Sequence, residues 1–145
     1  MAYKAIQIAQ LLLSKAAESK QELMSNLKLQ KMLYYEQGFH LAAFGTPLFE
    51  EDIEAWMYGP VVPDVYNLYA KYEACGIEPP EKIDLELSEE ETILFNNVFD
   101  VYNQYSATKL VEMTHNEPPW SNVTPGRGNI ISQESMKAFF QTRLA

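Results

Sequence analysis

The stretch LKLQKMLYYEQGFHLAAF, residues 27–44, constrains the fold of this chain more than any other segment. The spacing of its apolar residues predicts a helix. Ser25 or Asn26 can cap its start, and the helix ends before Gly45. Apolar side chains occur on most sides of this helix. One face carries Leu29, Met32, Leu33, Glu36 and His40, and other faces carry Leu27, Tyr34, Leu41 and Phe44. Since a helix that is apolar on most sides normally lies inside its domain, we expect this one to form the centre of the core.

Helical spacing and capping residues predict further helices before and after this segment. The first runs over residues 3–17, and another begins at Pro63, a residue suited to the first turn of a helix. Ser88 and Glu91 form the S-x-x-E pattern of a capping box. Ser106 can cap a helix that ends near Thr114, and Ser132 can cap a terminal helix. Residues 115–129, with three prolines and two glycines, are predicted to be non-helical.

Two short segments are predicted to form strands. Ile53 and Ala55 alternate with Glu54 and Trp56 within residues 49–57, and residues 129–132 can add a second strand. Gly59 and Pro60 are predicted to form the corner between the first strand and the next helix. The predicted fold class is therefore α+β and predominantly α-helical. We expect five or six helices around the central helix and a small two- or three-stranded antiparallel sheet, in a single domain over residues 1–145.

The net charge of −9 argues against non-specific binding to nucleic acid, which depends on clustered Lys and Arg. The excess of acidic over basic side chains is uneven along the chain. Residues 1–75 carry six basic and nine acidic side chains, and residues 76–145 carry five and eleven. This acidic half is either a solvated surface or a docking surface for a basic partner.

No run of roughly 20 apolar residues could cross a bilayer, and the amphipathic start is not that of a signal peptide. We therefore expect no membrane association. The single cysteine, Cys75, allows no internal disulfide, which fits the cytoplasm.

Motifs for catalysis, metal binding or phosphate binding are absent from the sequence. His40 and His115 have no metal-ligand spacing, and Cys75 has no neighbouring histidine. We expect no metal, no cofactor and no catalytic residue. His115 and Glu117 could in principle act as an acid–base pair, so that a hydrolase stays open as an alternative.

Aromatic residues near the predicted corners are the best candidates for contacting a partner, because Trp and Tyr recur in binding hot spots. The same residues can also fill the core where helices meet the sheet. Lys28 and Lys31 precede two of the tyrosines by one turn and are expected on a surface patch. The candidate partner-binding residues are Lys28, Lys31, Tyr34, Tyr35, Trp56, Tyr58 and Trp120, with Tyr66 nearby. Gly59, Pro60, Pro63 and His115 are expected to serve the fold.

Residues 27–66 resemble the signature of the Panacea domain, the family of SocA-like antitoxins and phage-associated GepA proteins. That signature reads K-L-Q-K-hydrophobic-Y-Y, then a G-x-x-L-F turn, then E-A-W-x-x-G-P-V. The matching residues are Leu29, Gln30, Lys31, Tyr34, Tyr35, Pro47, Leu48, Phe49, Glu54, Ala55, Trp56, Gly59, Pro60 and Val61. A second block, SATKLVEMTHNEPPW, matches at Leu110, Thr114, His115, Pro119 and Trp120. The resemblance extends from about residue 5 to about residue 142, and Glu36 departs from it where the family usually has a small residue.

The resemblance implies a non-enzymatic antitoxin that neutralises a toxin by direct contact. In SocA-like members it also implies delivery of the toxin to a cellular protease, and it suggests a phage or prophage setting. The implied partners are proteins, with no direct nucleic-acid binding.

A second hypothesis comes from the acidic residues between Glu78 and Glu91, which could mimic nucleic acid and block a DNA-binding protein.

Overall fold

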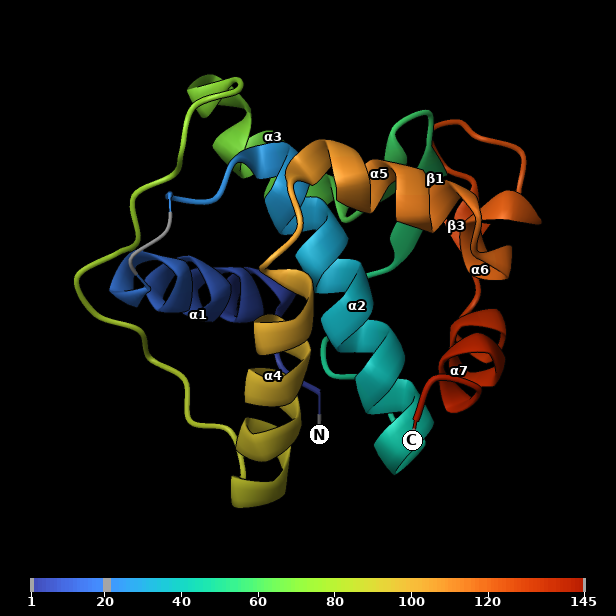
Figure 1. Cartoon of the computed structure of the whole chain (residues 1–145), viewed down its shortest axis with the longest axis horizontal. Helices are drawn as coiled ribbons and strands as arrows, with labels where there is room; N and C mark the ends of the chain where they lie inside the picture. The colour runs from blue at the N-terminus through green and yellow to red at the C-terminus, as the bar shows by residue number, and fades with distance from the viewer. Residues whose placement is uncertain (1, 20–21, 145) are drawn as a thin grey trace.

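The computed structural model describes residues 2–19 and 22–144. Helix α2 (Asn26–Phe44) crosses the middle of the molecule, and the other helices surround it (Figure 1). Every residue from Leu29 to Leu41 is buried, which confirms that this helix forms the centre of the core. The surrounding helices are α1 (Ala5–Glu18), α3 (Pro63–Tyr69), α4 (Glu89–Tyr102), α5 (Ala107–His115), α6 (Pro118–Ser121) and α7 (Gln133–Gln141).

The ends of α2 follow the predicted capping chemistry. The side chain of Ser25 accepts a hydrogen bond from the backbone N–H of Lys28, and Gly45 follows the last turn with a left-handed φ of 77°. The N-terminal caps of α4, α5 and α7 are also the predicted ones: Ser88, Ser106 and Ser132. Glu91 completes the capping box of α4. Local hydrogen-bonding chemistry therefore places both ends of α2 and the starts of α4, α5 and α7.

A three-stranded antiparallel sheet lies beside the helices, with strand β1 (Ile53–Trp56) between β2 (Gly59–Val61) and β3 (Ile130–Ile131). The predicted fold class, α+β and predominantly α-helical with a small antiparallel sheet, is confirmed. The predicted corner at Gly59 and Pro60 is wrong. Those two residues pair with β1 as part of β2, and the turn lies one step earlier, at Met57 and Tyr58. Pro60 fits this edge strand because its missing N–H is not needed for the ladder.

Residues 118–121 form the short helix α6, although residues 115–129 are predicted to be non-helical. The prediction is wrong at this point because Pro118 and Pro119 occupy the first turn. The backbone N–H groups of the first turn have no partner within a helix, so that proline fits there without loss of a hydrogen bond.

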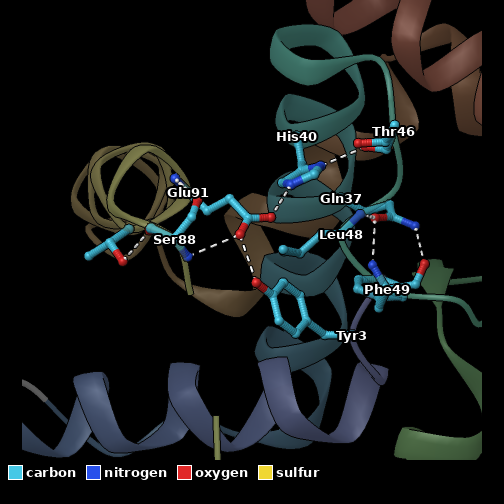
Figure 2. A network of polar contacts seen from close by, with 9 residues as sticks. Tyr3, Gln37, His40, Thr46, Leu48, Phe49, Ser88 and Glu91 are labelled. Atoms are coloured by element: carbon cyan, nitrogen blue, oxygen red, sulfur yellow. Dashed lines mark hydrogen bonds and ion pairs between the residues drawn. The ribbon is translucent and has the colours of Figure 1, made fainter. Parts of the chain in front are cut away.

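The buried side chain of Gln37 joins α2 to the segment that leads into the sheet (Figure 2). Its Oε1 accepts hydrogen bonds from the backbone N–H of Leu48 at 2.6 Å and of Phe49 at 3.3 Å. Its Nε2 donates to the carbonyl of Phe49 at 3.0 Å. The amide thus serves this backbone as a neighbouring strand would, which satisfies polar groups that would otherwise be buried without partners.

A second polar network joins the N-terminal segment, α2 and α4 (Figure 2). The two oxygens of Glu91 accept from the hydroxyl of Tyr3 and contact Nε2 of His40, both at 2.7 Å. The other ring nitrogen of His40 lies 2.6 Å from the carbonyl oxygen of Thr46, so both nitrogens face acceptors. Burial acts to raise the pKa of Glu91, but hydrogen bonds from His40, Tyr3 and Ser88 outweigh it and lower that pKa to about 2.

Glu36 is the residue that departs from the family pattern, and it is buried on α2. Its Oε2 has no hydrogen-bond partner among the described residues. Burial raises the pKa of this carboxyl well above its usual range, although the charge of Lys15 on α1 acts in the opposite direction. A buried carboxyl group without a partner is most stable in its neutral form.

Replacing Gln37 with Leu tests the role of its amide. The change leaves buried backbone groups of Leu48 and Phe49 unpaired, and we expect it to lower the free energy of unfolding by about 2–4 kcal/mol. Gln104→Leu is the matched control, because Gln104 is exposed and its one hydrogen bond within the described residues goes to the carbonyl of Val101. The control should change stability by less than about 0.5 kcal/mol. Urea unfolding measures both, and equal effects would contradict this role.

Replacing Glu91 with Gln tests the second network. Because the folded-state pKa of Glu91 lies below its unfolded value, its contribution is present above about pH 4.5 and is lost as the pH falls toward 2. The stability difference between wild type and Glu91→Gln should therefore shrink as the pH is lowered from 6 to 3. Glu90→Gln, in the same helical turn and exposed, should show a small difference at all pH values. A Glu91→Gln difference that does not vary with pH would contradict the assignment.

Candidate partner-binding site

The β1–β2 hairpin presents two large side chains to solvent at its turn. Met57 is 70% exposed and Tyr58 is 64% exposed, more than any other large apolar side chain in the described part of the chain. The pairing of Trp56 with Gly59 leaves only these two residues in the turn. Met and Tyr are enriched in protein interfaces, so that this exposed turn is a candidate contact surface.

Trp56, the last residue of β1, is held from three directions beside this turn. Its indole N–H donates to Oε1 of Glu54 at 2.9 Å. The ring of Tyr66 meets it edge-on at a centroid distance of 5.1 Å, and the guanidinium of Arg127 lies 4.5 Å from its ring. Glu54 also accepts from the N–H of Gly128, which fixes the loop that carries Arg127. Contacts within the chain therefore fix the ring of Trp56 beside the turn.

A pocket of about 340 Å³ opens beneath the hairpin. Aromatic side chains of Trp56, Tyr58 and Tyr66 line it together with apolar residues, and polar residues of α2 lie at its base. Such a concave, largely apolar site can receive one side chain of a partner. Its other lining residues are Asn26, Leu27, Gln30, Lys31, Met57, Val61, Ala70, Glu73 and Ala74.

Lys31 lies below the hairpin and is fully buried. Its ammonium donates to the carbonyl of Pro60 at 3.0 Å, and burial lowers its pKa to about 7. Gly59 passes directly over this side chain with a φ of 110°. A Cβ at Gly59 would lie 2.7 Å from Cε of Lys31 and 2.8 Å from Oγ1 of Thr114. Both the backbone angle and the close approach therefore require glycine here.

Two further polar residues of α2 hold the chain on the far side of the hairpin. Gln30 accepts from the N–H of Val62 at 2.9 Å and donates to Asn26 at the same distance. Asn26 in turn donates to the carbonyl of Tyr66 at 3.0 Å. The hairpin and the start of α3 are thereby fixed to the central helix by side-chain hydrogen bonds.

The hydroxyls of Tyr34 and Tyr35 both point to one carboxylate. They donate to the two oxygens of Glu117 at 2.9 Å each. Burial raises the pKa of Glu117 to about 7, while the hydrogen bonds from both tyrosines and the charge of Arg143 act to lower it. These contacts join the two sequence blocks that carry the family resemblance.

Trp120 links this second block to the hairpin. Its indole N–H donates to the backbone carbonyl of Trp56 at 2.8 Å, and His115 stacks on its ring at a centroid distance of 4.0 Å. Nε2 of His115 is buried without a hydrogen-bond partner in the described residues. His115 makes no hydrogen bond to Glu117 there, so the geometry gives the acid–base alternative no support.

The predicted surface patch around Lys28 and Lys31 is wrong. Lys31 is buried, and the half-buried Lys28 donates to the carbonyl of Asn103 at 2.7 Å. Tyr34 and Tyr35 are fully buried and cannot touch a partner in this conformation.

Of the candidate residues, Trp56 and Tyr58 lie together at the hairpin, and Trp120 supports them from below. Sequence reasoning missed Met57 and Arg127. Met57 stands between two aromatic residues that were considered, and a prediction of the turn at residues 57–58 would have found it. Nothing in the sequence around Arg127 points to its stacking on Trp56.

The described residues contain no group of three or more His, Cys, Asp or Glu side chains that could hold a metal ion. Within residues 2–19 and 22–144, no helix has the length and apolar character needed to span a membrane.

Comparisons with known proteins agree with the sequence resemblance. Residues 29–121 match the family described as antitoxin SocA-like, Panacea domain. The chain is also similar to the antitoxin SocA of Caulobacter vibrioides, with 32% identity over 139 residues that cover 83% of this chain and 70% of that protein. No solved structure matches significantly. Since the family match covers more than half of the chain and includes both α2 and the hairpin, this protein belongs to the SocA-like antitoxin family with a Panacea domain.

Proposed function

We propose that this chain is a non-enzymatic antitoxin that neutralises a protein toxin by direct contact, with the β1–β2 hairpin as its main contact surface. The observation that carries this proposal is the exposure of Met57 and Tyr58 beside an ordered Trp56. Family membership supports the antitoxin role. The partner is a toxin protein, and its side chain would enter the pocket between Trp56, Tyr58 and Tyr66.

The order of this surface favours binding energetically. Association costs free energy when side chains and loops become fixed, and a surface that is already fixed avoids part of that cost. Trp56 is held by Glu54, Tyr66 and Arg127, and the hairpin backbone is held by Lys31 through Pro60. The exposed residues Met57 and Tyr58 are therefore presented on a rigid base, as binding hot spots usually are.

Other parts of the proposal rest on the family resemblance alone. These are delivery of the toxin to a cellular protease and a phage or prophage setting. A cytoplasmic location is also part of the proposal. The exposed free thiol of Cys75 fits the reducing cytoplasm.

Mimicry of nucleic acid is a second candidate function, favoured by the segment between η1 (Ala70–Tyr72) and α4. This segment runs extended along the outside of α1 (Figure 1). Gln7 of α1 donates to its Asp84 carbonyl at 3.2 Å. Its exposed acidic residues are Glu78, Glu81, Asp84 and Glu86, and Glu89 and Glu90 follow at the start of α4.

Substitution of the hairpin tip tests the main proposal. Each adjacent open reading frame is expressed alone and together with this chain. The product that is toxic alone and is neutralised by this chain serves as the partner. Tyr58→Asp and Met57→Asp should each weaken its binding by about tenfold to a hundredfold, because they remove apolar contacts and add a buried charge. Calorimetry on the purified proteins measures the change, and growth rescue reports neutralisation.

Ile93→Asp is the matched control, since Ile93 is 57% exposed on α4, away from the hairpin (Figure 1). It should leave binding unchanged. Wild-type affinity in both hairpin variants would contradict the assignment of this surface.

Neutralising the acidic segment separates the two candidate functions. A variant with Glu78→Gln, Glu81→Gln, Asp84→Asn and Glu86→Gln should keep full toxin neutralisation if the hairpin is the contact surface. Loss of neutralisation in this variant, with the hairpin variants unaffected, would favour nucleic-acid mimicry. Growth rescue is measured for the hairpin variants and for the variant of the acidic segment, and the two results are compared.

A further inference from the structure

The turn after η1 holds a glutamate in a backbone conformation that favours glycine. Glu73 has a φ of 52° and a ψ of −121°, and it is the one non-glycine residue with a positive φ in the described part of the chain. The carbonyl of Tyr72 accepts a hydrogen bond from the N–H of Cys75 at 2.9 Å, which closes a turn with Glu73 at its second position. These angles are those of a type II′ turn, in which glycine normally occupies this position. A side chain is therefore kept here at a cost in free energy, and such costs are typical of functional sites.

Contacts within the fold do not explain why Glu73 is a glutamate. Its side chain is exposed, and it makes no hydrogen bond or ion pair within residues 2–19 and 22–144. The ammonium of the neighbouring Lys71 lies instead over the ring of Tyr72, 5.7 Å from its centroid. The carboxylate of Glu73 is therefore available to a group from another molecule.

Glu73 lines the pocket beneath the hairpin, and it alone is acidic among the described residues of the lining. Trp56, Tyr58 and Tyr66 contribute aromatic side chains to the same pocket. The faces of aromatic rings attract cations, and the guanidinium of Arg127, 4.5 Å from the ring of Trp56, is an example within this chain. A pocket that combines aromatic side chains with an exposed carboxylate is suited to a cationic side chain.

Lys31 is the basic residue of the lining, and its position does not oppose a second cation. It is fully buried and its ammonium donates to the carbonyl of Pro60, so that it presents no exposed charge to the pocket. Burial lowers the pKa of Lys31 to about 7, so that this group can release its proton when another cation enters. The net charge of −9 also attracts a basic partner.

We propose that the pocket beneath the hairpin receives a lysine or arginine side chain of the toxin, and that the carboxylate of Glu73 binds the charged group of that side chain. The aliphatic part of the same side chain would contact Trp56 and Tyr66. This inference rests on the proposed function, because it assigns a chemical class to the toxin residue that enters the proposed contact surface. It also explains a glutamate at a turn position where glycine would be more stable.

Replacing Glu73 with Gln removes the charge and keeps the size of the side chain. The variant should bind the toxin, identified by growth rescue as above, about tenfold more weakly in calorimetry. Raising the salt concentration from about 50 to about 500 mM should weaken the binding of wild type more than that of the variant, because salt screens the ion pair. Glu78→Gln is the matched control, since Glu78 is exposed on the same segment and does not line the pocket. It should bind the toxin as wild type does.

Replacing Glu73 with Gly separates binding from folding. Since glycine adopts a positive φ without strain, this variant should raise the Tm by about 2–6 °C and still lose as much affinity as Glu73→Gln. A chain that is more stable than wild type cannot have lost its affinity by failing to fold. Glu73→Gln keeps the strained backbone and should melt within about 1 °C of wild type.

Substitutions in the toxin identify the other half of the ion pair. Each Lys and Arg of the toxin is replaced with Met, one at a time, and binding is measured to wild type and to Glu73→Gln. One of these substitutions should weaken binding to wild type by about tenfold and binding to Glu73→Gln by less than about threefold, because the pair is already broken there.

The inference would be overturned by wild-type affinity in Glu73→Gly, or by basic toxin residues that all lose the same affinity for both chains. If Tyr58→Asp still weakens binding in that case, the hairpin remains the contact surface and only the assignment of a basic side chain fails. Wild-type affinity in both Tyr58→Asp and Met57→Asp would instead contradict the proposed contact surface and this inference together.

Discussion

Hydrogen bonds from buried side chains of α2 to the backbone of residues 48–66 are the interactions on which the rest of this structure depends. The sheet has only three short strands, so much of that backbone has no neighbouring strand to bond. Gln37 bonds Leu48 and Phe49, Lys31 bonds Pro60, and Gln30 bonds Val62. Each bond satisfies a polar group that would be costly to leave unpaired in the core. The adjacent Gln and Lys of the K-L-Q-K part of the family signature, Gln30 and Lys31, therefore have a structural explanation.

The same hydrogen bonds also support the hairpin that we propose as the contact surface. The hairpin is short, and an isolated two-stranded hairpin is at best marginally stable in water. Hydrogen bonds from Lys31 and Trp120 and the stacking of Arg127 on Trp56 support it, so that it exposes Met57 and Tyr58 without losing its shape.

Much of the fold could be predicted from the sequence, because local chemistry determines it. The Ser88–Glu91 capping box and Gly45 after α2 place helix ends through contacts within a few residues. The side chains around α2 could not be placed in this way. On a helix that is buried on all sides, the periodicity of apolar residues no longer distinguishes inside from outside. Lys31 and Tyr35 are buried because Pro60 and Glu117, distant in sequence, supply their partners. The turn at residues 57–58 does not follow from the sequence, because the Gly59-Pro60 pair is typical of a corner, whereas Gly59 is needed where the chain passes over Lys31.

Hydrogen–deuterium exchange on the chain alone and in complex with its toxin tests the central claim most directly. It follows every backbone amide at once and needs no substitution. We predict that the backbone amides that gain protection from exchange on binding lie mainly in residues 54–58 and 66–74. These residues form the hairpin and the facing wall of the pocket. Added protection confined to residues 78–90 or to α4, with the hairpin unchanged, would contradict it.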